Sequence, residues 1–547
     1  MTMGSFFRLR PAAVATGIAS LLPYTPLHAQ TTPALPQAVP PAAAAEEPVD
    51  AEMMRRIRDE GLNRSQVVQT VSYLTDVIGP RLTGSPSLKR ANEWTRTQLI
   101  GWGLQNARLE PWGPFGRGWS ITRFSAQVTH PINIGLIAVP KAWSPSLSRP
   151  LDTEVLFLDA AAVGELAKYR GKLKGKVVLL SPLRKIAARF EPMGVRYSDD
   201  ALAQIAAAPL PSRPPVTSAP AALLSPIARL RFAQDEGAAL VIDSSRTGDG
   251  GTLFVQSAQV PYSATVPREQ HIPVFRRDAP KIVPQVTLAS EQYNRLLRIV
   301  QAGETVKIGV DLKTAFHDDD GGMVFNTVAE IPGGDKKEEL VMCGGHLDSW
   351  HGATGATDNA AGVGVCMEAV RILKALRVQP RRTIRIALWT GEEQGIYGSA
   401  AYVAQHFGTA ASPKPEYDKL SAYFNLDNGT GKVRGIWGQN NLAAMPIFSQ
   451  WLQPFRDLGA TTVTARNTGS TDHIPFDRIG LPGFQFIQDS IEYGTRTHHS
   501  NQDVFDRIQG DDLKQASVVM AAFLYNAAMR NEKLPRKQPA PLAVRTP

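Results

Sequence analysis

Two kinds of hydrophobic spacing alternate in the second half of the chain. Short, uninterrupted apolar runs of strand length occupy residues 340–343 and 384–389, and between them, in 363–376, every third or fourth residue is apolar. Continuous apolar runs indicate strands buried on both faces, whereas the wider spacing indicates a helix with one apolar face. Similar runs at 422–426 and 484–487 supply further strands. We therefore expect an α/β fold with a mixed, mostly parallel open sheet flanked by helices.

The first half of the chain has a different pattern. A helical pattern begins at residue 50, and Ser85-Pro86 is a suitable N-cap and first-turn pair for a helix that reaches about residue 104. Between residues 122 and 315, short apolar runs are separated by glycine, proline and polar turns, as at 155–158, 176–180, 239–242 and 286–288. This change predicts a second, β-rich domain inserted into the first.

Polar groups follow the predicted strands at the point where each strand ends. In doubly wound sheets ligands bind beyond the carboxyl ends of the strands, so these side chains are expected to meet. They are His346 and Asp348, Glu392 and Glu393, Asp427, and the pair His498-His499, with Asp358 at the start of the predicted helix.

Each of these residues also has a simpler explanation when it is taken alone. Asp358 could be a helix N-cap, Glu392 and Glu393 could be solvated loop carboxylates, and His346 could be a satisfied histidine beside a surface acid. Their combination favours a metal site, because two imidazoles and three carboxylates suit zinc. Five ligands are too many for one tetrahedral catalytic ion that also holds water. They are right for two ions that share one carboxylate.

The order His-x-Asp, Asp-Asn, Glu-Glu, Asp, His-Ser-x-x-Asp is similar to that of the co-catalytic dizinc exopeptidases, and the resemblance covers about residues 63–531. It implies two Zn²⁺ ions per chain. It implies that His346 and Asp427 hold one zinc, that Glu393 and His499 hold the other, and that Asp358 bridges them. It further implies that Asp348 orients His346 and that Glu392 is the general base.

The resemblance also bears on three other site residues, His498, Asp472 and His473. His499 is the ligand of the histidine pair, because it has the family's spacing to Asp503. His498 stands where a relative has a tyrosine that assists the tetrahedral intermediate, and a protonated imidazole could give the same hydrogen bond. A buried, satisfied histidine is the alternative. Asp472 and His473 are candidate substrate contacts, although turn capping explains Asp472 nearly as well.

The chain divides into six predicted segments. They are a signal peptide (1–29), a disordered Pro/Ala-rich linker (30–49), the N-terminal helical part of the peptidase domain (50–121), an insert that resembles a protease-associated domain (122–315), the catalytic zinc peptidase domain (316–531) and a flexible tail (532–547). Near the last insert boundary, 317–320 reads His-Asp-Asp-Asp, which fits a solvated linker turn better than an ion site.

Charge and cysteine content narrow the class of partners. The net charge of +9 is mild for 547 residues and is scattered, so nucleic acid is not expected as a partner. After the leader, no segment has the eighteen or so uninterrupted apolar residues that cross a bilayer.

Cys343 and Cys366 are the only cysteines. Their positions are typical of buried thiols, and a disulfide between them is the alternative. We expect a secreted or periplasmic protein, cleaved near Ala29, and leave open a homodimer.

The predicted function is that of a secreted dizinc metallopeptidase that hydrolyses terminal peptide bonds of small peptides or dipeptides. Segments 346–350 and 498–500 resemble the carboxypeptidase Q branch of the family, but an aminopeptidase is equally compatible with the ligand order. Two alternatives remain. A glutaminyl-peptide cyclase would share the fold and use one zinc. A non-catalytic, receptor-like relative would lack ligands or the base.

Overall fold

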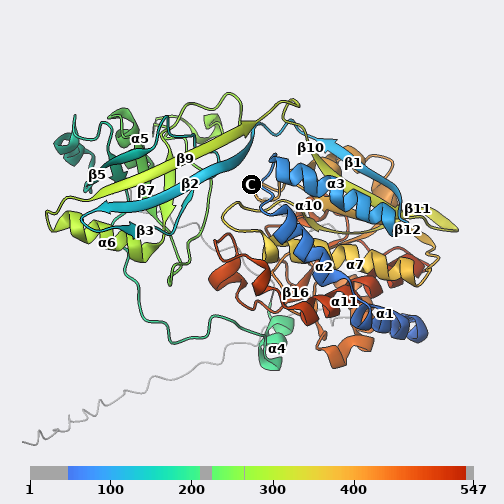
Figure 1. The fold of residues 1–547 in the computed structure, drawn as a ribbon. Coiled ribbons are helices and arrows are strands. Elements are labelled where there is room, and N and C mark those ends of the chain that lie inside the picture. Colours follow the sequence, from blue (N-terminus) through green and yellow to red (C-terminus); the bar gives the residue numbers. More distant parts are fainter. Residues whose placement is uncertain (1–46, 210–223, 264, 538–547) are drawn as a thin grey trace, which may run out of the picture. The chain divides into compact units, whose positions relative to one another are not determined.

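The computed structural model describes residues 47–209, 224–263 and 265–537 (Figure 1). The predicted signal peptide, nearly all of the predicted linker and residues 538–547 of the predicted tail lie outside the described residues. No helix within the described ranges is both long enough and apolar enough to cross a membrane.

Eight strands form the first sheet, which carries the predicted site. Their spatial order is β1 (Gln105–Trp112), β10 (Val324–Ile331), β12 (Arg382–Trp389), β11 (Lys336–His346), β13 (Leu420–Asn425), β16 (Gly483–Gln488), β14 (Val433–Trp437) and β15 (Thr462–Thr464). The central strands β12, β11, β13 and β16 are parallel, and β10 and β14 pair antiparallel to their inner neighbours. The prediction of a mixed, mostly parallel sheet is confirmed.

Helices cover both faces of this sheet, which explains the uninterrupted apolar runs. Successive residues of β11 alternate between two cores, because Val341 and Cys343 join one core and Leu340 and Met342 join the other. The first core also contains α1 (Ala51–Asn63), α2 (Val67–Ser72), α3 (Pro86–Gly101), α7 (Ala361–Ala375), α9 (Met445–Leu452) and α11 (Gly510–Met529), several of which are labelled in Figure 1. The second contains α8 (Tyr397–His406) and α10 (Ile474–Arg478).

Local capping sets where the first helices begin. The Asp50 side chain accepts a hydrogen bond of 2.9 Å from the Met53 N–H at the start of α1. The Ser85 side chain accepts one of 3.2 Å from the Leu88 N–H, and Pro86 occupies the first turn of α3, as predicted.

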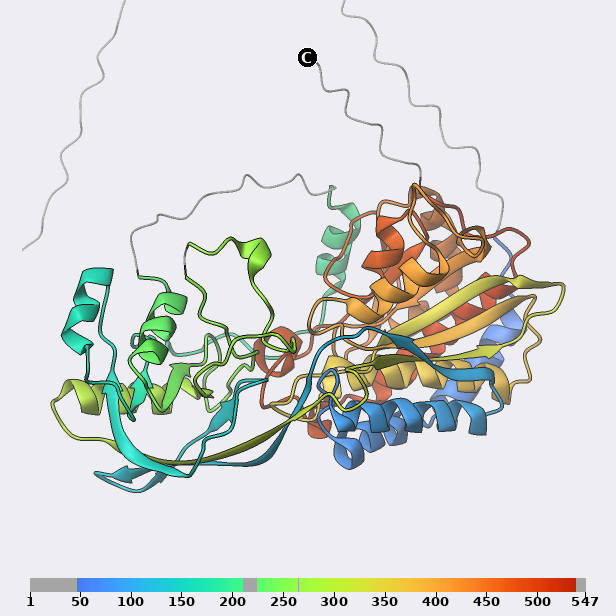
Figure 2. The same ribbon diagram turned by 90° about the horizontal axis from the view of Figure 1, so that it is seen from above.

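A second sheet is built from residues between β1 and β10. Its order is β3 (Ile134–Gly135), β2 (Gly118–His130), β9 (Lys307–His317), β5 (Leu151–Phe157), β6 (Val177–Leu179), β7 (Leu240–Ser244), β8 (Gln285–Leu288) and β4 (Ala138–Pro140), and the same segment holds α4 (Asp199–Ala207), α5 (Pro226–Asp235) and α6 (Ser290–Gln301). Figure 2 shows β2 and β9 side by side, and Gly118 pairs with His317 at one end of this ladder. The β-rich segment therefore runs from residue 118 to 317. Its likeness to a protease-associated domain stays a prediction.

The two cysteines do not form a disulfide in the structure. Cys343 in β11 and Cys366 in α7 are both buried free thiols. The acidic turn after β9 makes ion pairs with neighbouring basic residues, since Asp318 lies 3.3 Å from Arg277 and Asp320 lies 3.6 Å from Lys89.

One ion-pair cluster makes stability depend on pH. At the end of α8, His406 Nε2 contacts a carboxylate oxygen of Glu110 in β1, and its Nδ1 lies 3.4 Å from Glu416 Oε2. Burial lowers the pKa of His406, but the two glutamates outweigh burial and raise that pKa to about 9. The protonated form is thus favoured by folding, so its contribution is complete below the unfolded pKa of about 6.5 and is lost as the pH rises through 9.

We expect His406→Gln to lower the free energy of unfolding on the order of 2 kcal/mol at pH 6 and by much less at pH 9.5. Urea denaturation of wild type and variant at both pH values measures this difference. Glu110→Gln removes the charge of one of the two glutamates paired with His406, and its effect on the free energy of unfolding should show the same pH dependence. An equal loss at both pH values would mean that His406 acts through packing alone.

Candidate metal centre

His346 ends β11, and its ring lies among carboxylates. Nε2 is 3.3 Å from Asp358 Oδ1 and 3.3 Å from Asp427 Oδ1. On the other side of the ring, Nδ1 is 3.0 Å from the main-chain carbonyl of Asp348. A proton on Nδ1 satisfies that carbonyl and leaves the Nε2 lone pair directed at the carboxylates, which is the tautomer that a metal ligand requires.

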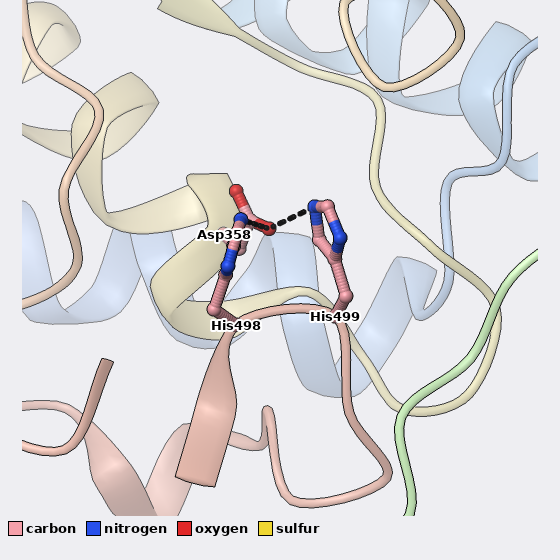
Figure 3. Close-up of side chains that lie close together, drawn as sticks. All are labelled: Asp358, His498 and His499. Atoms are coloured by element: carbon pink, nitrogen blue, oxygen red, sulfur yellow. Dashed lines mark ion pairs between the residues drawn. The ribbon is translucent and has the colours of Figure 1, made fainter. Parts of the chain in front are cut away.

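A second histidine approaches the same aspartate from another loop. His499 Nε2 is 2.9 Å from Glu393 Oε2 and 3.2 Å from Asp358 Oδ2. Figure 3 shows that His498 and His499 leave the same loop and that both rings point toward Asp358, with His498 Nε2 at 3.8 Å from Asp358 Oδ2. The two oxygens of Asp358 therefore face different histidines.

Asp358 is not the cap of the helix that follows it. Asn359 takes that role, because its Oδ1 accepts a hydrogen bond of 3.0 Å from the Gly362 N–H in the first turn of α7. The Asp358–Asn359 peptide bond is cis. Asp358 is only 3 % exposed, and its two carboxylate oxygens lie 3.3 Å from His346 Nε2 and 3.2 Å from His499 Nε2.

The donor set fits bound cations. Two groups of side chains bring ligand atoms within 4.8 Å of one another: Asp358 with His498 and His499, and His346 with Asp358 and Glu393. Asp358 belongs to both groups. Among the described residues, neither Asp358 Oδ2 nor Glu393 Oε1 has a hydrogen-bond partner, although His499 Nε2 lies 3.2 Å from Asp358 Oδ2. Both buried oxygens are therefore available to a bound cation.

The pKa values reflect the concentration of buried negative charge. Burial and the charge of Asp358 raise the pKa of Glu393 to about 7, and burial raises the pKa of Glu392 well above its usual value. Burial lowers the pKa of His499, but Glu393 and Asp358 outweigh it and raise that pKa to about 11. His346 is likewise held well above its usual pKa by Asp427 in spite of burial. Bound cations would reverse this repulsion between carboxylates.

Asp348 makes different contacts from those expected. Its carboxylate Oδ1 is 3.7 Å from His346 Nδ1, and the main-chain carbonyl rather than the carboxylate accepts the ring hydrogen bond. The carboxylate instead accepts hydrogen bonds from the N–H groups of Glu392 and Glu393, both at 3.3 Å, and from Thr83 Oγ1 at 2.8 Å. Asp348 therefore holds the turn that presents the two glutamates.

Arg81 is a site residue that the sequence pattern did not identify. Its wholly buried guanidinium donates to the carbonyls of Leu347, Thr354 and Gly355 at 2.7 to 2.8 Å, so it joins the loops that carry His346 and Asp358. Burial lowers the pKa of Arg81 to about 10. It lies within the region that resembles the family, but nothing in the sequence pattern marks the arginine itself.

Asp503 and Tyr493 were also not assigned. Asp503 accepts hydrogen bonds from the N–H groups of Thr357 (2.6 Å) and Asp358 (3.2 Å), and burial raises its pKa to about 7. The Tyr493 hydroxyl donates to Asp358 Oδ1 at 3.0 Å. The spacing of Asp503 to His499 was the one available signal for its importance.

The two predicted substrate contacts are fully buried. Asp472 accepts a hydrogen bond from the Ser399 hydroxyl, and His473 Nε2 lies 2.8 Å from Gln439 Nε2 and 3.2 Å from the Thr468 carbonyl. Their role as substrate contacts stays a prediction.

The sequence is similar to that of known peptidases. Residues 326–524 match Peptidase family M28. Carboxypeptidase Q from Bos taurus is 27% identical over 477 residues, which covers 87% of this chain and 88% of the relative. Aminopeptidase YwaD from Bacillus subtilis is 28% identical over 208 residues, or 36% of this chain and 43% of the relative.

Solved structures resemble the fold over most of its length. The crystal structure of a peptidase M28 precursor from Shewanella amazonensis has a TM-score of 0.62 at 22% identity and covers 90% of this chain and 99% of that chain. The structure titled BSAP, a zinc aminopeptidase from Bacillus subtilis, has a TM-score of 0.52 at 18% identity and covers 90% and 98%. The family match includes β11, which ends at His346, and β12, β13 and β16, which precede Glu393, Asp427 and His499. The match to carboxypeptidase Q covers much more of the chain. Residues 326–524 thus resemble peptidase family M28, and the similarity to carboxypeptidase Q and to the solved peptidase structures supports a metallopeptidase.

Proposed function

We propose that the chain is a zinc-dependent exopeptidase that uses two Zn²⁺ ions to hydrolyse terminal bonds of dipeptides and small peptides. The observation that carries the proposal is the position of Asp358. One of its oxygens faces His346 and the other faces His499, at 3.3 and 3.2 Å. A carboxylate shared between two nitrogen ligands is the arrangement expected for a bridging ligand of two ions.

Two further ligands complete this arrangement. Asp427 lies 3.3 Å from His346 Nε2, and Glu393 lies 2.9 Å from His499 Nε2, so each half of the site has one imidazole, one carboxylate of its own and one oxygen of Asp358. Mixed nitrogen and oxygen ligands of this kind suit zinc. The relative titled a zinc aminopeptidase supports the choice of metal.

Glu392 is the proposed general base. Its main chain is fixed by Asp348, and it adjoins Glu393 without belonging to either group of converging ligand atoms. Zinc ions held by the five ligands would supply an acidified water and polarise the scissile carbonyl. The Glu392 carboxylate takes the proton from the attacking water and transfers it to the leaving amine. His498 lies beside Asp358, where a ring N–H can donate a hydrogen bond to the reacting carbonyl oxygen, while the Tyr493 hydroxyl donates its hydrogen bond to Asp358.

The relatives support the proposed class of substrate. Carboxypeptidase Q matches almost the whole chain, and an aminopeptidase matches part of it. Both names support an enzyme that recognises one free end of a peptide. We propose that the enzyme acts outside the cytoplasm, after removal of a leader near Ala29. A one-zinc glutaminyl cyclase is disfavoured, because Asp358 faces a second imidazole–carboxylate pair, His499 and Glu393.

Glu392→Gln should lower kcat about 10²- to 10⁴-fold, because the proton acceptor is lost while the proposed metal ligands remain. Zinc content, measured by atomic absorption, should stay near two per chain. Glu393→Gln is the matched control, since it alters the adjacent residue and should reduce zinc content. Full turnover by Glu392→Gln would remove this residue from the mechanism.

Asp358→Asn should lose both metal and activity, because one oxygen of an amide cannot replace a carboxylate that serves two ions. Asp472→Asn is the control, since Asp472 is also a buried carboxylate near the site but belongs to neither group of converging ligand atoms. Metal analysis after dialysis distinguishes the two variants. Two zincs retained by Asp358→Asn would rule out the bridging role.

Four forms of one short peptide identify the terminus that the enzyme recognises. One form has both ends free, one has an acetylated amino end, one has an amidated carboxyl end, and one has both ends blocked. We expect cleavage of the free peptide, loss of cleavage when one particular end is blocked, and no cleavage of the doubly blocked form. Product analysis by mass spectrometry gives the answer. Hydrolysis of the doubly blocked peptide would exclude an exopeptidase, and cyclisation of an N-terminal glutamine would support the cyclase.

A further inference from the structure

The loop that carries His499 is paired with a segment of the insert. The Val255 N–H donates to the His499 carbonyl at 2.8 Å, and the Asn501 N–H donates to the Leu253 carbonyl at 3.0 Å. Phe254 and Ser500 form an antiparallel bridge between these two bonds. Residues 253–255, which lie between β7 and β8 of the second sheet, thus form a short ladder with residues 499–501 of the site loop.

The Asn501 side chain adds two hydrogen bonds to this ladder. Its Oδ1 accepts from the Leu253 N–H at 2.9 Å, and its Nδ2 donates to the Gly251 carbonyl at 3.1 Å. Both ends of the amide are therefore used on main-chain groups of the insert. Together with its own N–H, Asn501 makes three hydrogen bonds to residues 251–253.

These contacts matter because of the backbone of His499. Its φ is +59°, in the left-handed region that residues with a Cβ adopt infrequently, so contacts from outside the loop help to hold this conformation. His499 Nε2 is 2.9 Å from Glu393 Oε2 and 3.2 Å from Asp358 Oδ2. A small rotation of this backbone would carry the ring out of reach of both carboxylates.

The other end of the site loop is held by a second segment of the insert. Val195 and Ile491 exchange two main-chain hydrogen bonds of 2.9 Å, and the Thr495 hydroxyl donates to the Met193 carbonyl at 2.7 Å. The loop that supplies His498 and His499 is therefore bound on both sides by residues inserted between β1 and β10.

We infer that Asn501 is a positioning residue that sets the zinc affinity of the His499 half of the site by fixing the site loop to residues 251–253 of the insert. Asn501 contacts neither the ligand atoms nor a substrate, and acts through the main chain of His499. This inference rests on the proposed role of His499 as a zinc ligand. It assigns to the insert a part in building the metal centre.

The test compares Asn501→Ala with Asn294→Ala in the full chain. Asn294 is a matched control, because its side chain also makes two main-chain hydrogen bonds, both to Arg184 (3.1 and 2.7 Å), within the second-sheet segment and away from the site loop. Zinc dissociation constants are measured by competition with a chromophoric chelator. In Asn501→Ala one of the two zincs should bind about 10- to 100-fold more weakly and the other should be unchanged. Saturating zinc should restore kcat.

Two further measurements separate the possible failures. Hydrogen exchange of the metal-free proteins should show faster exchange of the Val255 and Asn501 amides in Asn501→Ala only, and this readout does not depend on zinc. Asn501→Asp keeps the acceptor and should fall between wild type and alanine. Zinc affinities equal to those of Asn294→Ala, or unchanged exchange at these amides, would overturn the inference. Failure of the wild type to bind a second zinc would instead overturn the proposed function.

Discussion

The structure depends on the burial of several carboxylates at one edge of a sheet. Asp348, Asp358 and Asp427 are between 0 and 9 % exposed. Burying ionised groups without partners is costly, and such groups normally become protonated instead. Main-chain N–H groups and the Thr83 hydroxyl offset this cost for Asp348, whereas Asp358 and Glu393 each keep one oxygen without a hydrogen-bond partner among the described residues.

The elements that carry these groups approach each other closely, and glycine allows this. A Cβ on Gly362 would lie 2.1 Å from the Leu426 carbonyl, so α7 can begin directly against the end of β13 only because no side chain is present. That approach brings Asp358, before α7, near Asp427, after β13. Arg81 completes the arrangement, since its guanidinium donors are shared among carbonyls of the two loops that carry His346 and Asp358.

Sequence reasoning identified the groups whose position in the chain reveals their position in space. A ligand at a strand end is marked by the apolar run that precedes it, so the amino-acid pattern alone places His346, Glu393 and Asp427 at one edge of the sheet. Asp358 and Asn359 show the limit of this reasoning. Both suit an N-cap, and only the three-dimensional contacts assign the cap to Asn359. The same limit explains why the pattern does not reveal Arg81 and Asn501. Their partners are main-chain groups distant in sequence, and any residue can supply those.

The ladder of β2 and β9 has a consequence for the order in which the chain can fold. Gly118 and His317 are paired neighbours, so once the second sheet has formed, its two ends already lie together. β1 and β10 can then pair as if a short turn connected them, and the entropic cost of closing a long flexible loop no longer opposes the first sheet. The insert thus makes a long-range strand pairing effectively local, and independent collapse of the second sheet would speed assembly of the first.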